Sequence, residues 1–357
     1  MGKSDYPTIE ELQAAEESDE LETEHNEQME LFAHFDLSKP KQKDYSNTVD
    51  IYDALPKYVW SSREQHDLKS ASRTRECIIK GAKFTVKVKP ALIERNNDDS
   101  VLIYPGQREE LVEDALRKLA VSGQGVYVNG KAGVSFSLYE LRTELEQMGH
   151  TYSFQELREA LFICRGAVLE CYSSDNRSVI TSNFFGLLAL TTQKDLEERG
   201  RDARCYVQFN PLVNESIMNL TFRQYNYKVG MELRSPLARY IYKRMAQYWT
   251  QASAEHPYTP KLVSFLEQSP RGLTKRMSEN LRAMRNALDI LEKHEVIARY
   301  DEDKEMKGKQ KVIDATYWIY PHPKFIKDVI SANQRNKALQ MKKTKQMLDA
   351  PSEDGEG

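Results

Sequence analysis

Apolar and polar residues are spaced regularly enough to divide the first half of the chain into elements. Between residues 76 and 93 they alternate, as in Phe84-Thr-Val-Lys-Val88, which is typical of strands. In 109–121 the apolar residues recur every three or four positions and predict a helix. A short extended piece at 134–136 then leads into Ser137-Leu-Tyr-Glu140, a capping box that predicts a helix to Met148.

A second capping box, Ser153-Phe-Gln-Glu156, predicts another helix directly after this one. The expected apolar stripe of that helix consists of Phe154, Leu157, Leu161, Cys164, Val168 and Cys171. Three runs rich in β-forming residues follow at 169–172, 178–190 and 204–213, separated by charged turns. Helix, turn, helix and β hairpin is the order of a winged helix–turn–helix.

The same order recurs in the second half of the chain. Ser235-Pro236 places a cap and a proline before a helix expected over 237–248, and Thr259-Pro260 does so for a helix through Glu267. Residues 269–272 form the expected turn. We expect Thr274 to cap a long third helix, whose apolar stripe is Met277, Leu281, Met284, Leu288 and Leu291. Residues 296–300 and 312–320 should then pair as strands around a charged tip at 301–311.

We therefore predict an α+β fold of two tandem winged helix–turn–helix domains, preceded by a disordered acidic N-terminal segment. The expected divisions are a leader at 1–50, a first domain at 51–218, a second domain at 219–330 and a C-terminal tail at 331–357. The two halves show no clear residue-level repeat, so this prediction depends on element order alone. An unrelated α+β domain is the alternative.

Charge is distributed unevenly and changes the picture of function. Residues 1–36 contain twelve Asp or Glu and one Lys, and such a segment buries too little apolar surface to fold. The net charge of the whole chain is −3, and residues 349–357 add four further acidic groups, so the body at 37–348 carries about +12. A basic body between acidic ends favours an anionic partner, nucleic acid above all, although an ordinary solvated surface is the alternative.

The third helix of the second domain carries the residues best suited to DNA. In this motif the N-terminal half of the second helix of the helix–turn–helix enters the major groove, where Arg can bind guanine and Asn adenine. The face opposite the apolar stripe presents Lys275, Ser278, Arg282, Arg285 and Asn286. At the expected hairpin tip, Lys307 and Lys309 are placed to contact phosphate. A solvated helix face with no DNA contact would show the same residue types.

The equivalent helix of the first domain is much less cationic. Its exposed face is expected to carry Gln155, Arg158, Phe162 and Arg165, together with two glutamates. An exposed Phe suits a protein interface as well as DNA. We therefore assign the first domain to dimerisation or to auxiliary DNA contact.

Catalytic, metal and membrane functions find no support in the residue patterns. The four cysteines lack the spacing of a zinc site, and no histidine pair accompanies a tyrosine nucleophile. The stretch 125–131 resembles a phosphate-binding loop but fails at Ala132, so we interpret Asn129-Gly130 as a turn. No apolar run is long enough to span a membrane. We expect a cytoplasmic protein that is not an enzyme and needs no cofactor or metal.

A short peptide in the acidic leader has a different character from its surroundings. Gln28, Met29, Leu31 and Phe32 stand within Gln28-Met-Glu-Leu-Phe32, which resembles the pentapeptide by which bacterial replication proteins dock on the sliding clamp of DNA polymerase. The glutamine amide would supply directional hydrogen bonds, and the two apolar side chains would fill a pocket.

Over roughly 28–320 the chain resembles TrfA-like plasmid replication initiators, relatives of the Rep proteins with two winged helices. The resemblance lies in the pentapeptide followed by Asp36, in Val134-Ser-Phe-Ser-Leu-Tyr-Glu-Leu141, and in Leu233-Arg-Ser-Pro-Leu-Ala-Arg239 running to His256-Pro-Tyr258 and Leu262. The chain departs from the family at Met29, where Leu is usual, and in its acidic rather than basic leader.

The resemblance implies a bacterial replication initiator that binds the repeated origin sites called iterons. Such a protein promotes melting of an adjacent AT-rich segment, with possible contact to single-stranded DNA, and recruits the host initiator, the replicative helicase and the sliding clamp. It would exchange between monomers and dimers. The alternative is a winged-helix transcriptional repressor or autoregulator, which would give the clamp-like peptide no role.

Overall fold

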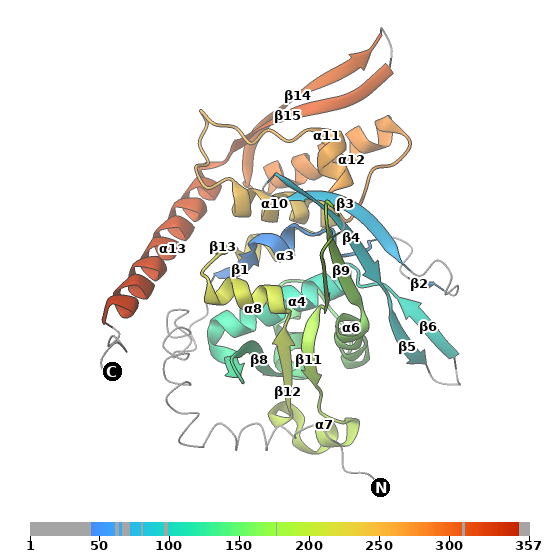
Figure 1. The fold of residues 1–357 in the computed structure, drawn as a ribbon, viewed down its shortest axis with the longest axis vertical. Coiled ribbons are helices and arrows are strands. Elements are labelled where there is room, and N and C mark those ends of the chain that lie inside the picture. Colours follow the sequence, from blue (N-terminus) through green and yellow to red (C-terminus); the bar gives the residue numbers. More distant parts are fainter. Residues whose placement is uncertain are drawn as a thin grey trace.

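The protein is an α+β molecule organised around two cores of buried apolar side chains. The computed structural model describes residues 44–60, 64–65, 72–79, 81–95, 99–175, 177–308 and 311–349. We call 64–218 the first unit and 227–329 the second unit. Figure 1 shows the second unit stacked on the first, with a β hairpin projecting at the top and a long C-terminal helix descending at one side.

The first unit contains three antiparallel sheets and five α-helices. One sheet has the order β10-β9-β4-β3 and comprises β3 (Arg73–Ile79), β4 (Ala82–Lys89), β9 (Val168–Ser173) and β10 (Val179–Asn183). A second has the order β11-β12-β8-β7 and comprises β7 (Gly125–Val128), β8 (Lys131–Ser137), β11 (Phe185–Ala189) and β12 (Arg204–Phe209). The third has the order β2-β6-β5 and comprises β2 (Glu64–Gln65), β5 (Ala91–Arg95) and β6 (Asp99–Ile103). The helices are α4 (Gln107–Leu119), continued by a π turn at Ala120–Gln124, α5 (Leu138–Gln147), α6 (Phe154–Gly166), α7 (Gln193–Arg199), continued by a 3₁₀ turn at Gly200–Asp202, and α8 (Pro211–Met218).

Both predicted capping boxes are present. At the start of α5 the Ser137 hydroxyl accepts from the Glu140 backbone N–H at 3.2 Å, and the Glu140 carboxylate accepts from the Ser137 N–H at 2.6 Å. Ser153 and Glu156 repeat this arrangement at the start of α6. Reciprocal bonds of this kind satisfy donors that the helix itself leaves open, which is why the sequence located both helix starts.

The end of α6 was predicted wrongly. The helix stops at Gly166, and Ala167 is extended, so Val168 and Cys171 belong to β9 rather than to the helical stripe. Cys171 is nevertheless buried, as are the three other cysteines. Strand side chains alternate between two faces, so Val168 and Cys171, three positions apart, lie on opposite faces of β9 although their spacing continues the helical pattern.

Two helices of the first unit lie within or beside stretches expected to be strands and turns. The run at 204–213 ends at Phe209, because Asn210 caps α8 through the Leu212 N–H and Pro211 takes the first helical position. The helix α7 occupies a connection that we expected to be a charged turn. The run at 178–190 is divided between β10 and β11, which belong to different sheets.

The predicted turn at Asn129-Gly130 is confirmed. It joins β7 to β8, and both residues have positive φ, 51° and 68°. Two consecutive left-handed residues match the twist of a tight hairpin, and Asn-Gly adopts them most readily. The stretch therefore has no phosphate-loop geometry, since a strand rather than a helix follows.

The second unit has the winged helix order. Its elements are α9 (Tyr227–Glu232), α10 (Pro236–Tyr248), α11 (Leu262–Glu267), α12 (Met277–Lys293), β14 (Ile297–Lys307) and β15 (Lys311–Pro321), followed by α13 (Pro323–Asp349). Isolated bridges from Tyr258 and Lys261 to β15 add a short third strand beside the hairpin. The first unit repeats the order with α4, β8, α5, α6 and the β9–β10 hairpin, so the predicted α+β fold of two tandem winged helices is confirmed.

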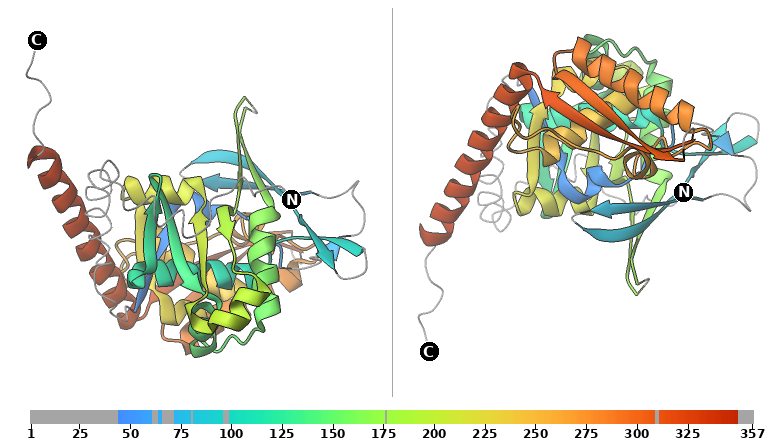
Figure 2. Two further views of the ribbon diagram at one scale, coloured as in Figure 1. Left: turned by 90° about the horizontal axis from the view of Figure 1, so that it is seen from below. Right: turned by 90° about the horizontal axis from the view of Figure 1, so that it is seen from above.

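A two-stranded ribbon joins the units. It pairs β1 (Tyr45–Val49) with β13 (Phe222–Asn226), and α3 (Asp50–Ala54) follows β1. This corrects the disordered segment expected at 1–50: its last residues form a buried strand, because the acidic run ends at Asp36 and Tyr45–Val49 can pair. The helix α13 packs on β13 and runs unbroken past residue 330, where we expected the tail to begin. Figure 2 shows it extending along the side of the body.

Candidate nucleic-acid interface

The helix α12 has one buried face and one exposed polar face. Leu281, Met284, Leu288 and Leu291 lie in the second core, as the apolar stripe predicted. Ser278, Arg282 and Asn286 are exposed on the opposite side, and Lys275 is exposed just before the first turn. Arg276, at the N-cap, adds a second cation there, with 80% of its side chain accessible. This side of the helix thus offers cations, the Ser278 hydroxyl and the Asn286 amide to a partner.

The turn before α12 is held by a buried amide that the sequence analysis did not single out. Asn280 is fully buried, and its Oδ1 accepts from the Thr274 N–H at 3.0 Å, the Thr274 hydroxyl at 2.9 Å and Arg271 Nη1 at 3.0 Å. Its Nδ2 donates to the Thr274 carbonyl at 2.8 Å. The predicted role of Thr274 as N-cap was wrong, because the helix starts later, with Arg276 at the cap. The sequence held one indication of this role, because Asn280 is a polar residue within the apolar stripe of the helix.

Arg285 is engaged within the protein. Its Nε and Nη2 bind the two carboxylate oxygens of Glu302 on β14, at 2.7 and 2.6 Å, and the Tyr317 hydroxyl donates to Glu302 at 2.8 Å. The hydrogen bond with Glu302 raises the pKa of Arg285, and the same bond lowers that of Glu302. Arg285, which we expected to face DNA, forms a bidentate link between α12 and the hairpin, with 40% of its side chain exposed.

The hairpin β14–β15 is longer than the sequence predicted. The stretch 301–311, expected to be a charged tip, is mostly paired strand, with Lys307 opposite Lys311 at the end. Successive side chains of a strand point to opposite faces, so charged residues can occupy the exposed face of a paired strand. The charged residues at 301–307 therefore did not indicate a loop. Asp301, Asp303 and Glu305 therefore share the outer face, opposite the buried Ala315, Tyr317 and Ile319. Lys307 is exposed beside the turn, while Lys309 lies outside the described residues.

The corresponding helix of the first unit, α6, offers less positive charge. Gln155 and Arg165 are exposed, and Phe162 is 47% exposed. Arg158 is partly buried and donates to the Thr191 carbonyl at 2.6 Å. Its guanidinium is therefore less available for the contact with DNA or protein that we expected. The exposed ring of Phe162 remains the feature that distinguishes this face from the exposed face of α12.

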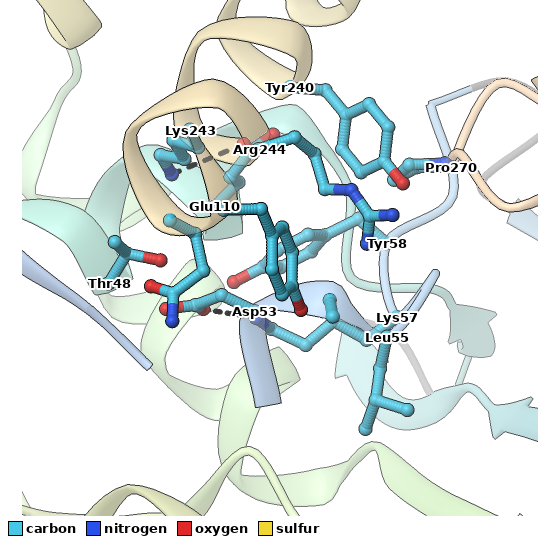
Figure 3. Close-up of a pocket in the computed structure, with 13 residues that line it drawn as sticks. Thr48, Asp53, Leu55, Lys57, Tyr58, Glu110, Tyr240, Lys243, Arg244 and Pro270 are labelled. Carbon is cyan, nitrogen blue, oxygen red and sulfur yellow. Dashed lines mark hydrogen bonds and ion pairs between the residues drawn. The ribbon is translucent and has the colours of Figure 1, made fainter. Parts of the chain in front are cut away.

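A small pocket between the units contains buried charges. It lies between α3, α4 and α10, has a volume of about 30 Å³, and is shown in Figure 3. Lys57 binds Asp53 at 2.8 Å, Lys243 binds both Glu110 and Asp114, and Arg239 approaches Glu110 at 3.4 Å.

These ion pairs set the charge states in the pocket. Burial alone would raise the pKa of Asp53, but Arg117 and Lys57 hold it well below its usual range. Burial raises the pKa of Asp114 despite Lys243. Opposite charges fill this site, which gives it the character of a packed junction between the units rather than of a ligand cavity.

Within 44–349, leaving out the gaps given above, no group of His, Cys, Asp and Glu is arranged to hold a metal ion. Nor is any described helix long and apolar enough to cross a bilayer. The clamp-like peptide at Gln28, Met29, Leu31 and Phe32 lies outside the described residues.

Comparison with known proteins gives distant structural likenesses. No protein-family model and no curated protein sequence matches the chain. The fold is similar to the crystal structure of RctB domains 2–3, with a TM-score of 0.44 and 11% identity over 76% of this chain and 96% of the other. It is also similar to the Pi initiator protein in complex with iteron DNA, with a TM-score of 0.40 and 8% identity over 60% of this chain and 94% of the other.

Proposed function

We propose that this protein is a replication initiator that binds iterons in origin DNA through α12 and acts without a catalytic residue. The observation that carries the proposal is the exposed N-terminal half of α12, where Lys275, Ser278, Arg282 and Asn286 face outward from a helix–turn–helix. Those residue types suit phosphate and base contacts in a major groove. The resemblance of residues 28–320 to TrfA-like initiators supports the same function.

The hairpin gives a second point of contact. Lys307 and Lys311 face each other at its end, beyond the acidic outer face formed by Asp301, Asp303 and Glu305. Acidic groups repel phosphate, so contact with the DNA backbone is confined to the tip. A helix in the major groove and a hairpin tip on the neighbouring phosphates together define the footprint of one unit.

Footprinting on the replication origin tests the proposal. We expect protection of evenly spaced direct repeats beside an AT-rich segment. A single protected palindrome would instead identify a transcriptional repressor built on the same fold.

Substitution of Arg282 tests the interface itself. Arg282→Ala should weaken binding to the repeat by about 1–3 kcal/mol if the guanidinium binds a base, with a smaller effect on random DNA. The matched control is Lys293→Ala, which removes an exposed cation from the far end of the same helix. Equal effects of the two substitutions would move the interface away from the start of α12.

We further propose that the protein recruits the replication machinery to the origin. Gln28, Met29, Leu31 and Phe32 would bind the sliding clamp, and other surfaces would engage the host initiator and helicase. Retention of the protein on immobilised clamp should disappear in a Leu31→Ala, Phe32→Ala double variant while iteron binding persists. Undiminished retention of that variant would remove the peptide from the proposal. Exchange between monomers and dimers would regulate the pool of protein able to bind DNA.

A further inference from the structure

An edge strand of the first unit approaches the helix–turn–helix of the second. The strand β3 is the last strand of the sheet β10-β9-β4-β3 and contacts α11. A cleft of about 570 Å³ lies between them, lined by Arg75, Ile78 and Lys83 from the first unit and by Gln268, Gly272 and Leu273 from the second. Figure 1 shows the β3–β4 pair rising toward α10 and α12.

One hydrogen bond crosses this boundary at the turn itself. Arg75 Nη1 donates to the Ser269 carbonyl at 2.6 Å, across 194 positions of sequence. Ser269 is fully buried, and its carbonyl also accepts from the Gly272 N–H at 3.1 Å. Gly272 has φ +72°, a left-handed conformation in which other residues are strained. The bond from Arg75 therefore holds the same carbonyl that closes the tight turn between α11 and α12.

Apart from the bond to Ser269 and the nearby Tyr240, the surroundings of Arg75 disfavour its charge. Burial lowers the pKa of Arg75, and the neighbouring Arg73 lowers it further. Among the residues that the structure describes, no carboxylate forms an ion pair with Arg75. Desolvating a guanidinium without a counter-charge is costly, and the charge-assisted bond to Ser269 is the interaction that offsets it.

The turn is held from the opposite side by its own unit. The Tyr240 hydroxyl on α10 donates to the Gln268 carbonyl at 3.0 Å, and the Tyr240 ring packs edge-on against Phe265 of α11. The Gln268 carbonyl is thus bound by a side chain of the second unit, and the next carbonyl, that of Ser269, is bound by a side chain of the first unit. The beginning of the turn that leads to α12 cannot shift relative to β3 or α10 without breaking one of these bonds.

We propose that Arg75 is a positioning residue that fixes the helix–turn–helix of the second unit against the first. This inference rests on the proposed function, because it concerns how α12 is aimed at DNA. It makes sequence recognition by the second unit depend on a side chain from β3. Specific binding, which needs α12 in register with base edges, should depend on Arg75 more than binding to phosphate alone.

The test compares Arg75→Ala, Arg75→Lys and Lys83→Ala. Lys83→Ala is the matched control, since it removes a cation from the same cleft that binds Glu76 rather than the turn. We expect Arg75→Ala to weaken binding to an iteron duplex about tenfold, the equivalent of one charge-assisted hydrogen bond. Binding to a random duplex and the salt dependence should match those of Lys83→Ala, and Arg75→Lys should recover most of the loss.

Hydrogen exchange of the free protein provides a readout that is independent of DNA. The Gly272 and Thr274 amides donate within the turn, so Arg75→Ala should speed their exchange, whereas Lys83→Ala should leave it unchanged. Unchanged exchange in Arg75→Ala would overturn the positioning role, whatever the DNA results. Equal losses on both duplexes with a shallower salt dependence would also overturn it, by making Arg75 a phosphate contact. If the wild type showed no preference for iterons, the proposed function would fail while the exchange result still decided the role of Arg75.

Discussion

Replacing Asn280 by Ala tests how the candidate recognition helix is held at its start. The substitution removes a fully buried amide that makes four hydrogen bonds, three as acceptor and one as donor. It leaves both the N–H and the carbonyl of Thr274 without these partners. Arg271 is partly exposed and keeps its bond to the Gly272 carbonyl, so water can replace much of what it loses.

The magnitude follows from those bonds. Each buried neutral hydrogen bond contributes about 1 kcal/mol net, and an abandoned buried partner costs about 1–3 kcal/mol. Alanine recovers roughly 0.5 kcal/mol through its higher helix propensity. The expected destabilisation by Asn280→Ala is therefore about 2–3 kcal/mol.

Urea unfolding followed by circular dichroism measures this difference, provided that the slope of the transition is unchanged. The matched control is Asn286→Ala, the same chemical change on the exposed face of the same helix, which should alter stability by less than about 0.5 kcal/mol. The reasoning is refuted if Asn280→Ala unfolds at the same urea concentration as Asn286→Ala.

Two further predictions concern charges that brace the fold. The bond from Arg285 holds the pKa of the Glu302 carboxyl below its usual range. The carboxylate therefore stabilises the protein fully at pH values above its pKa in the unfolded chain, about 4.3. This stabilisation is lost as the pH falls through the lower pKa that Glu302 has in the folded protein. Glu302→Gln should lower the thermal midpoint at pH 7 and flatten the loss of stability below about pH 4, as followed by melting curves across pH; curves parallel to those of the wild type would contradict this. Lys243→Met leaves Glu110 and Asp114 with less compensation in a buried pocket and should cost about 3–5 kcal/mol in urea unfolding, with part of the loss restored by adding Asp114→Asn. Wild-type stability of Lys243→Met would mean that these carboxylates remain solvated.

The sequence predicted those elements whose ends are marked by local chemistry. The capping boxes at Ser137 and Ser153, the Ser235-Pro236 start of α10 and the Asn129-Gly130 turn all depend on residues within four positions of each other. Such signals act before any tertiary contact forms. They located the starts of α5, α6 and α10, which helped to establish the tandem order.

Features that depend on distant partners could not be predicted in the same way. The strand β1 exists because β13 pairs with it, and the hairpin strands extend through charged residues because they pair with each other. Arg285 looked like a free cation on a helix face until Glu302, seventeen positions later, proved to lie within reach. Exposed residues of α12 that need no partner, such as Arg282 and Asn286, were placed correctly on the outer face by helical periodicity alone.

The helix α13 has a consequence for the order in which the chain can fold. Its early residues Phe325 and Val329 belong to the second core, while Leu339 belongs to the first. The Arg335 guanidinium lies 4.4 Å from the centre of the Tyr45 ring, so a side chain near the end of the described chain rests on one near its beginning.

During synthesis, the ribbon of β1 and β13 is complete once Asn226 has left the ribosome, yet its covering helix begins only at Pro323. Contacts between residues so distant in sequence close late in folding. A nascent chain that has reached the second unit therefore carries an uncovered ribbon, and the docking of α13 is the step that covers it.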